Sequence, residues 1–254
     1  MISRFSTPLN ESETALLDSI GLSTSARVVL RRRWTVALDR GAYASTLVAG
    51  LMTFAASARH GLGFAAISAV IGGLVLSLSL VAHEAGHLLL GRRAKGITPR
   101  ILLIRSLGGV SIVEGHCEDP RGAALFAAGG PLASLLVSIT LLTVGLMLPT
   151  QFATALILPG VLTLVLLGMN LLPMAPMDGY LLFRSAVWAE LGSRAEAERR
   201  AIDWSRAALG WAGFVSLTLC ARSSLYGILA LFLVGSFMLQ HHAVARRFMP
   251  VRVR

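Results

Sequence analysis

Residues 80–88 read Leu-Val-Ala-His-Glu-Ala-Gly-His-Leu, and this stretch decides how the rest of the chain is interpreted. His83 and His87 are four residues apart, so on a helix their imidazoles lie on nearly the same face and can reach one metal ion. Glu84 follows the first histidine, which points its carboxylate beside that metal, where a bound water would lie. The pattern His-Glu-x-x-His is typical of zinc hydrolases. It is embedded here in one of the most apolar segments of the protein.

The composition indicates a membrane protein. Of the 254 residues, 55% are apolar and only 14% are charged, which is too apolar for a soluble enzyme of this size. Several uncharged runs approach or exceed the ~20 residues that span a bilayer as a helix. We therefore expect an all-α polytopic membrane protein, with no removable signal peptide at its start.

Six membrane spans are expected, with both termini in the cytosol. The expected segments are a cytosolic N-terminal arm (1–41), a catalytic membrane core (42–180) with spans at about 42–58, 62–91, 122–148 and 152–173, a cytosolic amphipathic segment (181–206), a C-terminal helical pair (207–240) that turns near Arg222, and a basic cytosolic tail (241–254). The basic residues support this arrangement, because 21 of the 23 fall in the inner segments 1–41, 92–121, 174–206 and 241–254 and only Arg59 and Arg222 fall outside them. The same distribution explains the net charge of +10 by membrane orientation, so no nucleic-acid partner is expected.

The topology predicts where a third metal ligand should lie. The second and fourth spans both run from outside to inside, and His83 lies about eight residues, or ~12 Å, before the inner end of the second span. A partner ligand should then come from the inner end of the fourth span. That end reads Asn-Leu-Leu-Pro-Met-Ala-Pro-Met-Asp-Gly over residues 170–179. Asp178 in this broken backbone suits a metal ligand, although an aspartate that caps the next helix is the alternative.

His-Glu-x-x-His in one span and Asn-x-x-Pro-x-x-Pro-x-Asp-Gly at the end of a later one together resemble the site-2 protease family of intramembrane zinc metalloproteases, in a compact form without a PDZ domain. The resemblance covers about residues 42–180. It implies one zinc ion per chain, held by His83, His87 and Asp178, with Glu84 as the general base and Asn170 supporting the substrate or the oxyanion. The implied activity is hydrolysis of peptide bonds within or near transmembrane segments of membrane-anchored substrates.

Two further elements match the family less closely. Residues 101–104 and 110–113 flank Leu107-Gly108-Gly109 and predict a short membrane-associated β-hairpin between the second and third spans. By resemblance, a substrate strand would pair near Gly108 and Gly109, while an ordinary surface hairpin is the alternative. In the third span, residues 128–134 resemble a Gly-Pro-x-x-Asn element, with Ser134 where asparagine is usual. That departure leaves the hydrogen-bonding role of the position open.

The expected partners are transmembrane protein substrates, the lipid bilayer and a separate regulatory membrane protein. The expected location is the inner membrane of a bacterial cell, with the active site near the cytosolic side. We also expect the first span and the last pair to gate substrate entry, since they flank the core. Two competing hypotheses remain: a catalytically inactive zinc-binding scaffold or transporter, and a different His-Glu-x-x-His membrane peptidase. The last ligand of that peptidase would be one of Glu190, Glu196 and Glu198.

Overall fold

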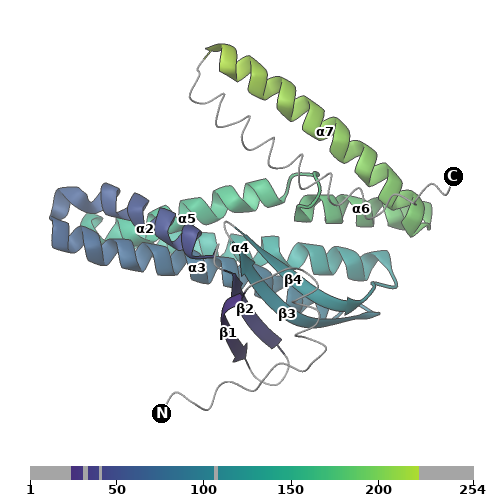
Figure 1. Cartoon of the computed structure of the whole chain (residues 1–254), viewed down its shortest axis with the longest axis horizontal. Helices are drawn as coiled ribbons and strands as arrows, with labels where there is room; N and C mark the ends of the chain where they lie inside the picture. The colour runs from purple at the N-terminus through teal and green to yellow at the C-terminus, as the bar shows by residue number, and fades with distance from the viewer. Residues whose placement is uncertain (1–23, 31–33, 40–41, 106–107, 223–254) are drawn as a thin grey trace.

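The computed structural model describes residues 24–30, 34–39, 42–105 and 108–222. The described elements, in chain order, are β1 (Thr24–Leu30), β2 (Trp34–Asp39), α2 (Ala42–Ser57), the short 3-10 helix η2 (Ala58–His60), α3 (Leu62–Gly91), β3 (Ile97–Arg105), β4 (Gly108–Gly115), α4 (Pro120–Met147), α5 (Thr150–Asn170), α6 (Asp178–Leu191) and α7 (Arg194–Arg222). Helices α2 to α5 lie side by side as an elongated layer, with the sheet against α3 and with α6 and α7 on the opposite side (Figure 1).

Three of the described helices, α3, α4 and α5, are long and apolar enough to cross a membrane. Their outward surfaces carry large exposed apolar side chains such as Leu78, Leu136 and Val165, as expected where lipid replaces water. Helix α2 has 16 residues and is shorter than these three. The expected sixth span and the basic tail lie outside the described residues.

Local sequence explains where these helices begin and end. Gly61, with φ 103°, lets the chain reverse between η2 and α3. Asp119 precedes α4 and its carboxylate accepts a hydrogen bond from the N–H of Gly122 at 2.6 Å. Helix α5 ends at Asn170, three residues before Pro173. Gly192, with φ 67°, ends α6 in the left-handed conformation.

The sheet is larger than the expected hairpin. β3 and β4 pair antiparallel between α3 and α4, but β2 pairs parallel to β3 and β1 pairs antiparallel to β2, giving the order β1-β2-β3-β4. Residues 24–39, which we assigned to an arm without strands, therefore supply half of a four-stranded sheet. The sequence gives little sign of this pairing because the partner of β2 lies more than 60 residues later in the chain.

Candidate metal centre

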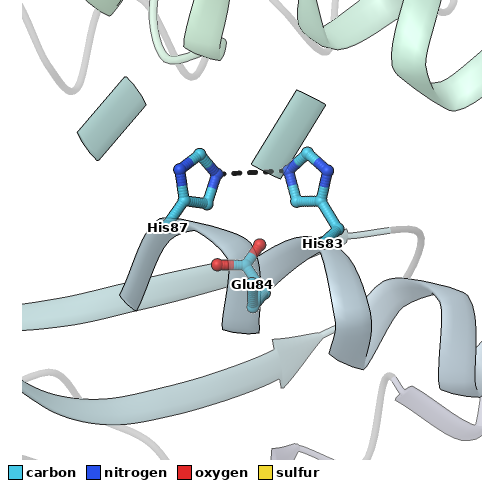
Figure 2. Close-up of side chains that lie close together, drawn as sticks. All are labelled: His83, Glu84 and His87. Carbon is cyan, nitrogen blue, oxygen red and sulfur yellow. Dashed lines mark hydrogen bonds between the residues drawn. The ribbon is translucent and has the colours of Figure 1, made fainter. Parts of the chain in front are cut away.

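His83 and His87 lie in the last third of α3 and face the same side of the helix. Figure 2 shows the two imidazole rings above the helix, with their facing nitrogens joined by a dashed line and Glu84 on the turn between them. The two Nε2 atoms are 3.3 Å apart. All three residues are buried, although they sit in a helix whose other face is exposed and apolar. The four-residue spacing thus places both rings where one cation can reach them.

Asp178, the first residue of α6, reaches the same point from a different part of the chain. Its Oδ2 lies 3.1 Å from Nε2 of His83 and its Oδ1 lies 3.2 Å from Nε2 of His87. The backbone before Asp178 is irregular from Leu171 onward and includes Pro173 and Pro176. A side chain on Gly179 would collide with the carbonyl oxygens of Leu171 and Leu172. The absence of a side chain there lets the loop fold tightly enough to bring the carboxylate to α3.

The other nitrogen of each imidazole already has a partner. Nδ1 of His87 lies 2.7 Å from the carbonyl oxygen of Phe126. A carbonyl can only accept, so Nδ1 carries the proton and neutral His87 presents a lone pair at Nε2. The N–H of Gly130, at 3.3 Å from the same Nδ1, is the weaker contact and cannot donate to a nitrogen that is itself a donor. Nδ1 of His83 lies 2.8 Å from the hydroxyl of Ser134, which can donate or accept and holds the ring in place. Such partners orient metal-binding imidazoles in proteins.

The facing atoms form a cluster of acceptors that a cation would satisfy. Oδ2 of Asp178 is buried and makes no hydrogen bond with any residue that the structure describes, despite its 3.1 Å contact with His83. Both observations are consistent if Nε2 of His83 has no proton to donate. Zinc with ligands at about 2.0–2.2 Å in tetrahedral geometry holds them roughly 3.3–3.5 Å apart, close to the 3.1–3.3 Å that separate these atoms. The residues present therefore fit a zinc ion.

Helix α4 keeps the space above the imidazoles open. A Cβ on Gly130 would collide with Nε2 of His87 and would lie 2.7 Å from Nε2 of His83. One residue earlier, Gly129 and Gly86 bring the backbones of α4 and α3 into direct contact, because a Cβ on either would strike the other's carbonyl oxygen. The two neighbouring glycines thus have separate effects: Gly129 allows the close approach of α4 to α3, and Gly130 leaves the space beside the two Nε2 atoms unblocked.

Two other predicted site residues lie at the same centre. Ligand atoms of His83, Glu84 and His87 lie within 4.8 Å of one another, so Glu84 is near enough to act on a group bound there. The Asp178 oxygens lie closer to the two imidazoles than this limit, at 3.1 and 3.2 Å. Nδ2 of Asn170 is 3.4 Å from Nε2 of His83. The structure therefore brings Glu84, Asn170 and Asp178 together with both histidines.

Other predicted residues lie elsewhere. Gly108 and Gly109 open β4 and pair with Arg105 and Ile104 of β3. Leu107, which we placed in the same turn, is outside the described residues.

The three alternative glutamate ligands have other environments. Glu198 is buried, but Tyr180 donates to its Oε1 at 2.6 Å and Arg184 to its Oε2 at 3.0 Å. Glu196 lies 3.5 Å from Arg200 on the same helix, and Glu190 is exposed. Burial beside the Glu198 carboxylate raises the pKa of Tyr180 far above its usual range, so its hydroxyl remains a donor. Sequence reasoning missed this network, as it missed Phe126, because a backbone carbonyl and a tyrosine carry no metal-site signature.

Curated relatives of the chain carry names from a single class of enzyme. A protein of Synechocystis is 30% identical over 194 residues, which are 73% of this chain and 49% of that protein. Rip3 of Mycobacterium tuberculosis is 33% identical over 156 residues, covering 57% of this chain and 39% of Rip3. A protein of Methanocaldococcus jannaschii is 29% identical over 121 residues, covering 47% and 35%. Each of these relatives is named as a zinc metalloprotease. No protein-family model matches the chain.

The fold has a solved counterpart. The site-2 protease from M. jannaschii superimposes with a TM-score of 0.54 over 90% of this chain and 97% of that one, at 18% identity. The chain thus resembles zinc metalloproteases in sequence and shares the fold of a site-2 protease. It spans about half the length of the Synechocystis relative, and less of the other two. The similarity to zinc metalloproteases agrees with a candidate metal centre at the cluster of His83, His87 and Asp178.

Proposed function

We propose that the chain is an intramembrane zinc endopeptidase that hydrolyses peptide bonds within or near transmembrane segments of membrane-anchored proteins. The observation that carries the proposal is that Nε2 of His83 and Nε2 of His87, on an apolar helix, both face the buried carboxylate of Asp178. His83, His87 and Asp178 would hold one zinc ion per chain. Zinc bound there would supply a Lewis acid that activates water and polarises the scissile carbonyl.

The protein's own groups would carry the proton and the substrate. Glu84 would accept a proton from the attacking water and return it to the leaving amine. The side-chain amide of Asn170, at the end of α5, would donate to the carbonyl oxygen of the substrate as charge develops on it. A peptide bond inside a helix is inaccessible, so the substrate must unwind. Pairing of the unwound segment with the edge of β4 near Gly108 and Gly109 would present it as a strand.

We further propose the cellular setting that the sequence indicates. The chain would be a multi-pass protein of a bacterial inner membrane with six spans, both termini in the cytosol and the metal near the cytosolic surface. Its partners would be transmembrane substrates and a separate regulatory membrane protein. The division into an N-terminal arm, a catalytic core over 42–180, an amphipathic segment over 181–206, a C-terminal pair of spans and a basic tail belongs to the same proposal.

Zinc content and cleavage together test this function. Zinc per chain would be measured in wild type, Asp178→Ala and Glu84→Gln purified in detergent. We expect one zinc in wild type and in Glu84→Gln, and a reduced amount in Asp178→Ala. Glu190→Ala, Glu196→Ala and Glu198→Ala are the alternative-ligand variants, and loss of zinc in one of them with retention in Asp178→Ala would favour the other peptidase class.

The cleavage assay uses liposomes that hold the protein and a tagged single-span polypeptide with glycine and asparagine in its inner half. Wild type should cut it within the span, as read by mass spectrometry, whereas Glu84→Gln and chelator-treated wild type should not. Zinc retention without cleavage of a panel of such polypeptides would favour the inactive zinc-binding scaffold or transporter.

A further inference from the structure

The loop that presents Asp178 is attached to α7 on both sides of that residue. Before it, the backbone N–H of Ala175 donates to the hydroxyl of Ser205 at 2.9 Å. After it, the hydroxyl of Tyr180 donates to Oε1 of Glu198 at 2.6 Å. Ser205 and Glu198 both belong to α7 and both are buried. Two hydrogen bonds from one helix thus bracket the carboxylate that faces the histidines.

Glu198 is held in place by a second group. Nη1 of Arg184, on α6, donates to its Oε2 at 3.0 Å, and only 16% and 12% of the two side chains are exposed. Both oxygens of Glu198 are therefore occupied by partners from the segment that begins at Asp178. A buried carboxylate with a cationic partner and a second donor has a defined orientation, which suits a group that fixes another element.

Apolar contacts also join the residues around Asp178 to α7. Ala175 and Tyr180 pack with Ala201 and Ile202 of α7 in one buried cluster. Met174 packs against Leu209, about two turns beyond Ile202 on α7. The Asp178 carboxylate itself turns away from α7, toward α3. Helix α7 thus contacts the residues around Asp178 while the ligand oxygens face the metal position.

We propose that Glu198 is a positioning residue for Asp178, acting through Tyr180 with Ser205 as a second attachment, so that α7 sets the place of the third zinc ligand. The inference rests on the metal centre of the proposed function. The loop over 171–177 consists of turns and bends rather than helix or strand, so these attachments to α7 further restrict the positions open to the carboxylate. Groups that are not metal ligands themselves but orient one change the metal affinity by about 10–100-fold when they are removed.

The zinc affinity of the full chain in detergent tests the proposal. The dissociation constant would be measured by competition with a chromogenic chelator for wild type, Tyr180→Phe, Glu198→Gln and Glu196→Gln. We expect roughly tenfold weaker binding in the first two variants and no change in Glu196→Gln. Glu196 is the matched control because it is two residues from Glu198 on α7 and forms only an exposed pair with Arg200. Tyr180→Phe keeps the ring and removes one oxygen, so it tests the contact even if Glu198→Gln does not fold.

A double-variant cycle separates positioning from general stability. In the Asp178→Ala background the third ligand is gone, so adding Tyr180→Phe should not weaken zinc binding further. Thermal unfolding of the metal-free proteins would be recorded alongside. Unchanged zinc affinity in Tyr180→Phe and Glu198→Gln, equal weakening by Glu196→Gln, or the same loss with and without Asp178 would each overturn the proposal.

The outcomes also distinguish this inference from the proposed function. A wild type that binds no zinc removes the metal centre and with it both proposals. Zinc binding that Tyr180→Phe and Glu198→Gln leave unchanged removes only the positioning role. The third outcome is a protein whose zinc binding depends on Tyr180 and Glu198 but which cleaves no transmembrane polypeptide. It would support the positioning role and contradict the proposed peptidase activity.

Discussion

Ser134 stands where its hydroxyl can fix the ring of His83. The sequence left the role of this position open, because serine replaces the asparagine that the family usually has there. In the structure its hydroxyl lies 2.8 Å from Nδ1 of His83, and the residue is 4% exposed. A serine one turn beyond the Gly129–Gly130 pair is thus sufficient to hold the imidazole with Nε2 toward the metal position.

We predict that Ser134→Ala weakens zinc binding by about tenfold, because the ring of His83 loses the partner that orients it. The chelator competition assay would measure this. Ser138→Ala is the matched control: Ser138 is also buried on α4, but its hydroxyl donates to the carbonyl of Gly160 on α5 at 3.2 Å. That variant should lose stability and keep its zinc affinity. Equal zinc affinities in both variants and wild type would contradict the role of Ser134.

The histidine, glutamate and aspartate positions could be predicted from sequence, because charged groups at spanning depth have few structural uses. Their orienting partners could not. The carbonyl of Phe126 is a backbone group that any residue would offer. The Tyr180–Glu198 contact joins two positions 18 residues apart across the connection between α6 and α7, and composition does not reveal how these helices pack. Sequence indicates which side chains have the required chemistry, whereas tertiary packing decides what holds them.

At the scale of elements, the closest approach of α3 and α4 determines the geometry of the centre. Gly86 lies between the two histidines and meets Gly129 backbone to backbone. A neighbouring backbone cannot move aside as a flexible side chain can, so an added methyl group must push the helices apart. The same displacement would move Phe126 and Ser134 away from the imidazoles that they orient.

We predict that Gly86→Ala destabilises the metal-free protein by about 1–3 kcal/mol, the usual effect of overpacking. Thermal unfolding in detergent would measure it. Gly63→Ala on the same helix is the control, because nothing lies within 4 Å of the Cβ it would add. Its effect should stay within about 0.5 kcal/mol. Similar melting temperatures for the two variants would show that α3 and α4 pack less closely at Gly86 than in this structure.

Element boundaries follow the sequence where local chemistry sets them and depart from it elsewhere. The expected second span, 62–91, has the bounds of α3, since Gly61 and the polar run after Gly91 mark both ends. Helix α7 instead continues without interruption through residue 206, where we had placed the change from an amphipathic segment to a membrane span. Alanine, arginine and glutamate favour helix on both sides of that point, so the helix continues although the hydropathy changes.

At the scale of the whole molecule, the sheet constrains how α2 crosses the membrane. Sixteen helical residues extend ~24 Å, short of the ~30 Å hydrocarbon core, and length alone leaves the role of α2 open. However, β2 precedes α2, β3 follows α3, and the two strands pair in parallel. Residues 34–39 and 97–105 must then lie on the same side of the bilayer. Since α3 is long and apolar enough to cross it once, we expect α2 to cross it back, with local thinning of the bilayer covering the mismatch.

The parallel pairing of β2 with β3 predicts on which side of the membrane three positions lie. Single cysteines would be introduced at Thr24, Arg59 and Ser193 in a chain with Cys117 and Cys220 changed to serine, and spheroplasts would be treated with a membrane-impermeant maleimide. Arg59→Cys, in the turn between α2 and α3, should react in intact spheroplasts. Thr24→Cys at the start of β1 and Ser193→Cys between α6 and α7 should react only after lysis, because the basic inner segments stay in the cytosol.

Thr24→Cys decides between the two topologies. If it reacts in intact spheroplasts together with Arg59→Cys, α2 does not cross and β2 cannot pair with β3. If it is protected together with Ser193→Cys, the sheet and the metal centre share the cytosolic side, since Asp178 precedes Ser193 by only one helix. An unwound substrate strand at the edge of β4 would then lie on the same side as the Glu84 carboxylate that is proposed to take the proton from water.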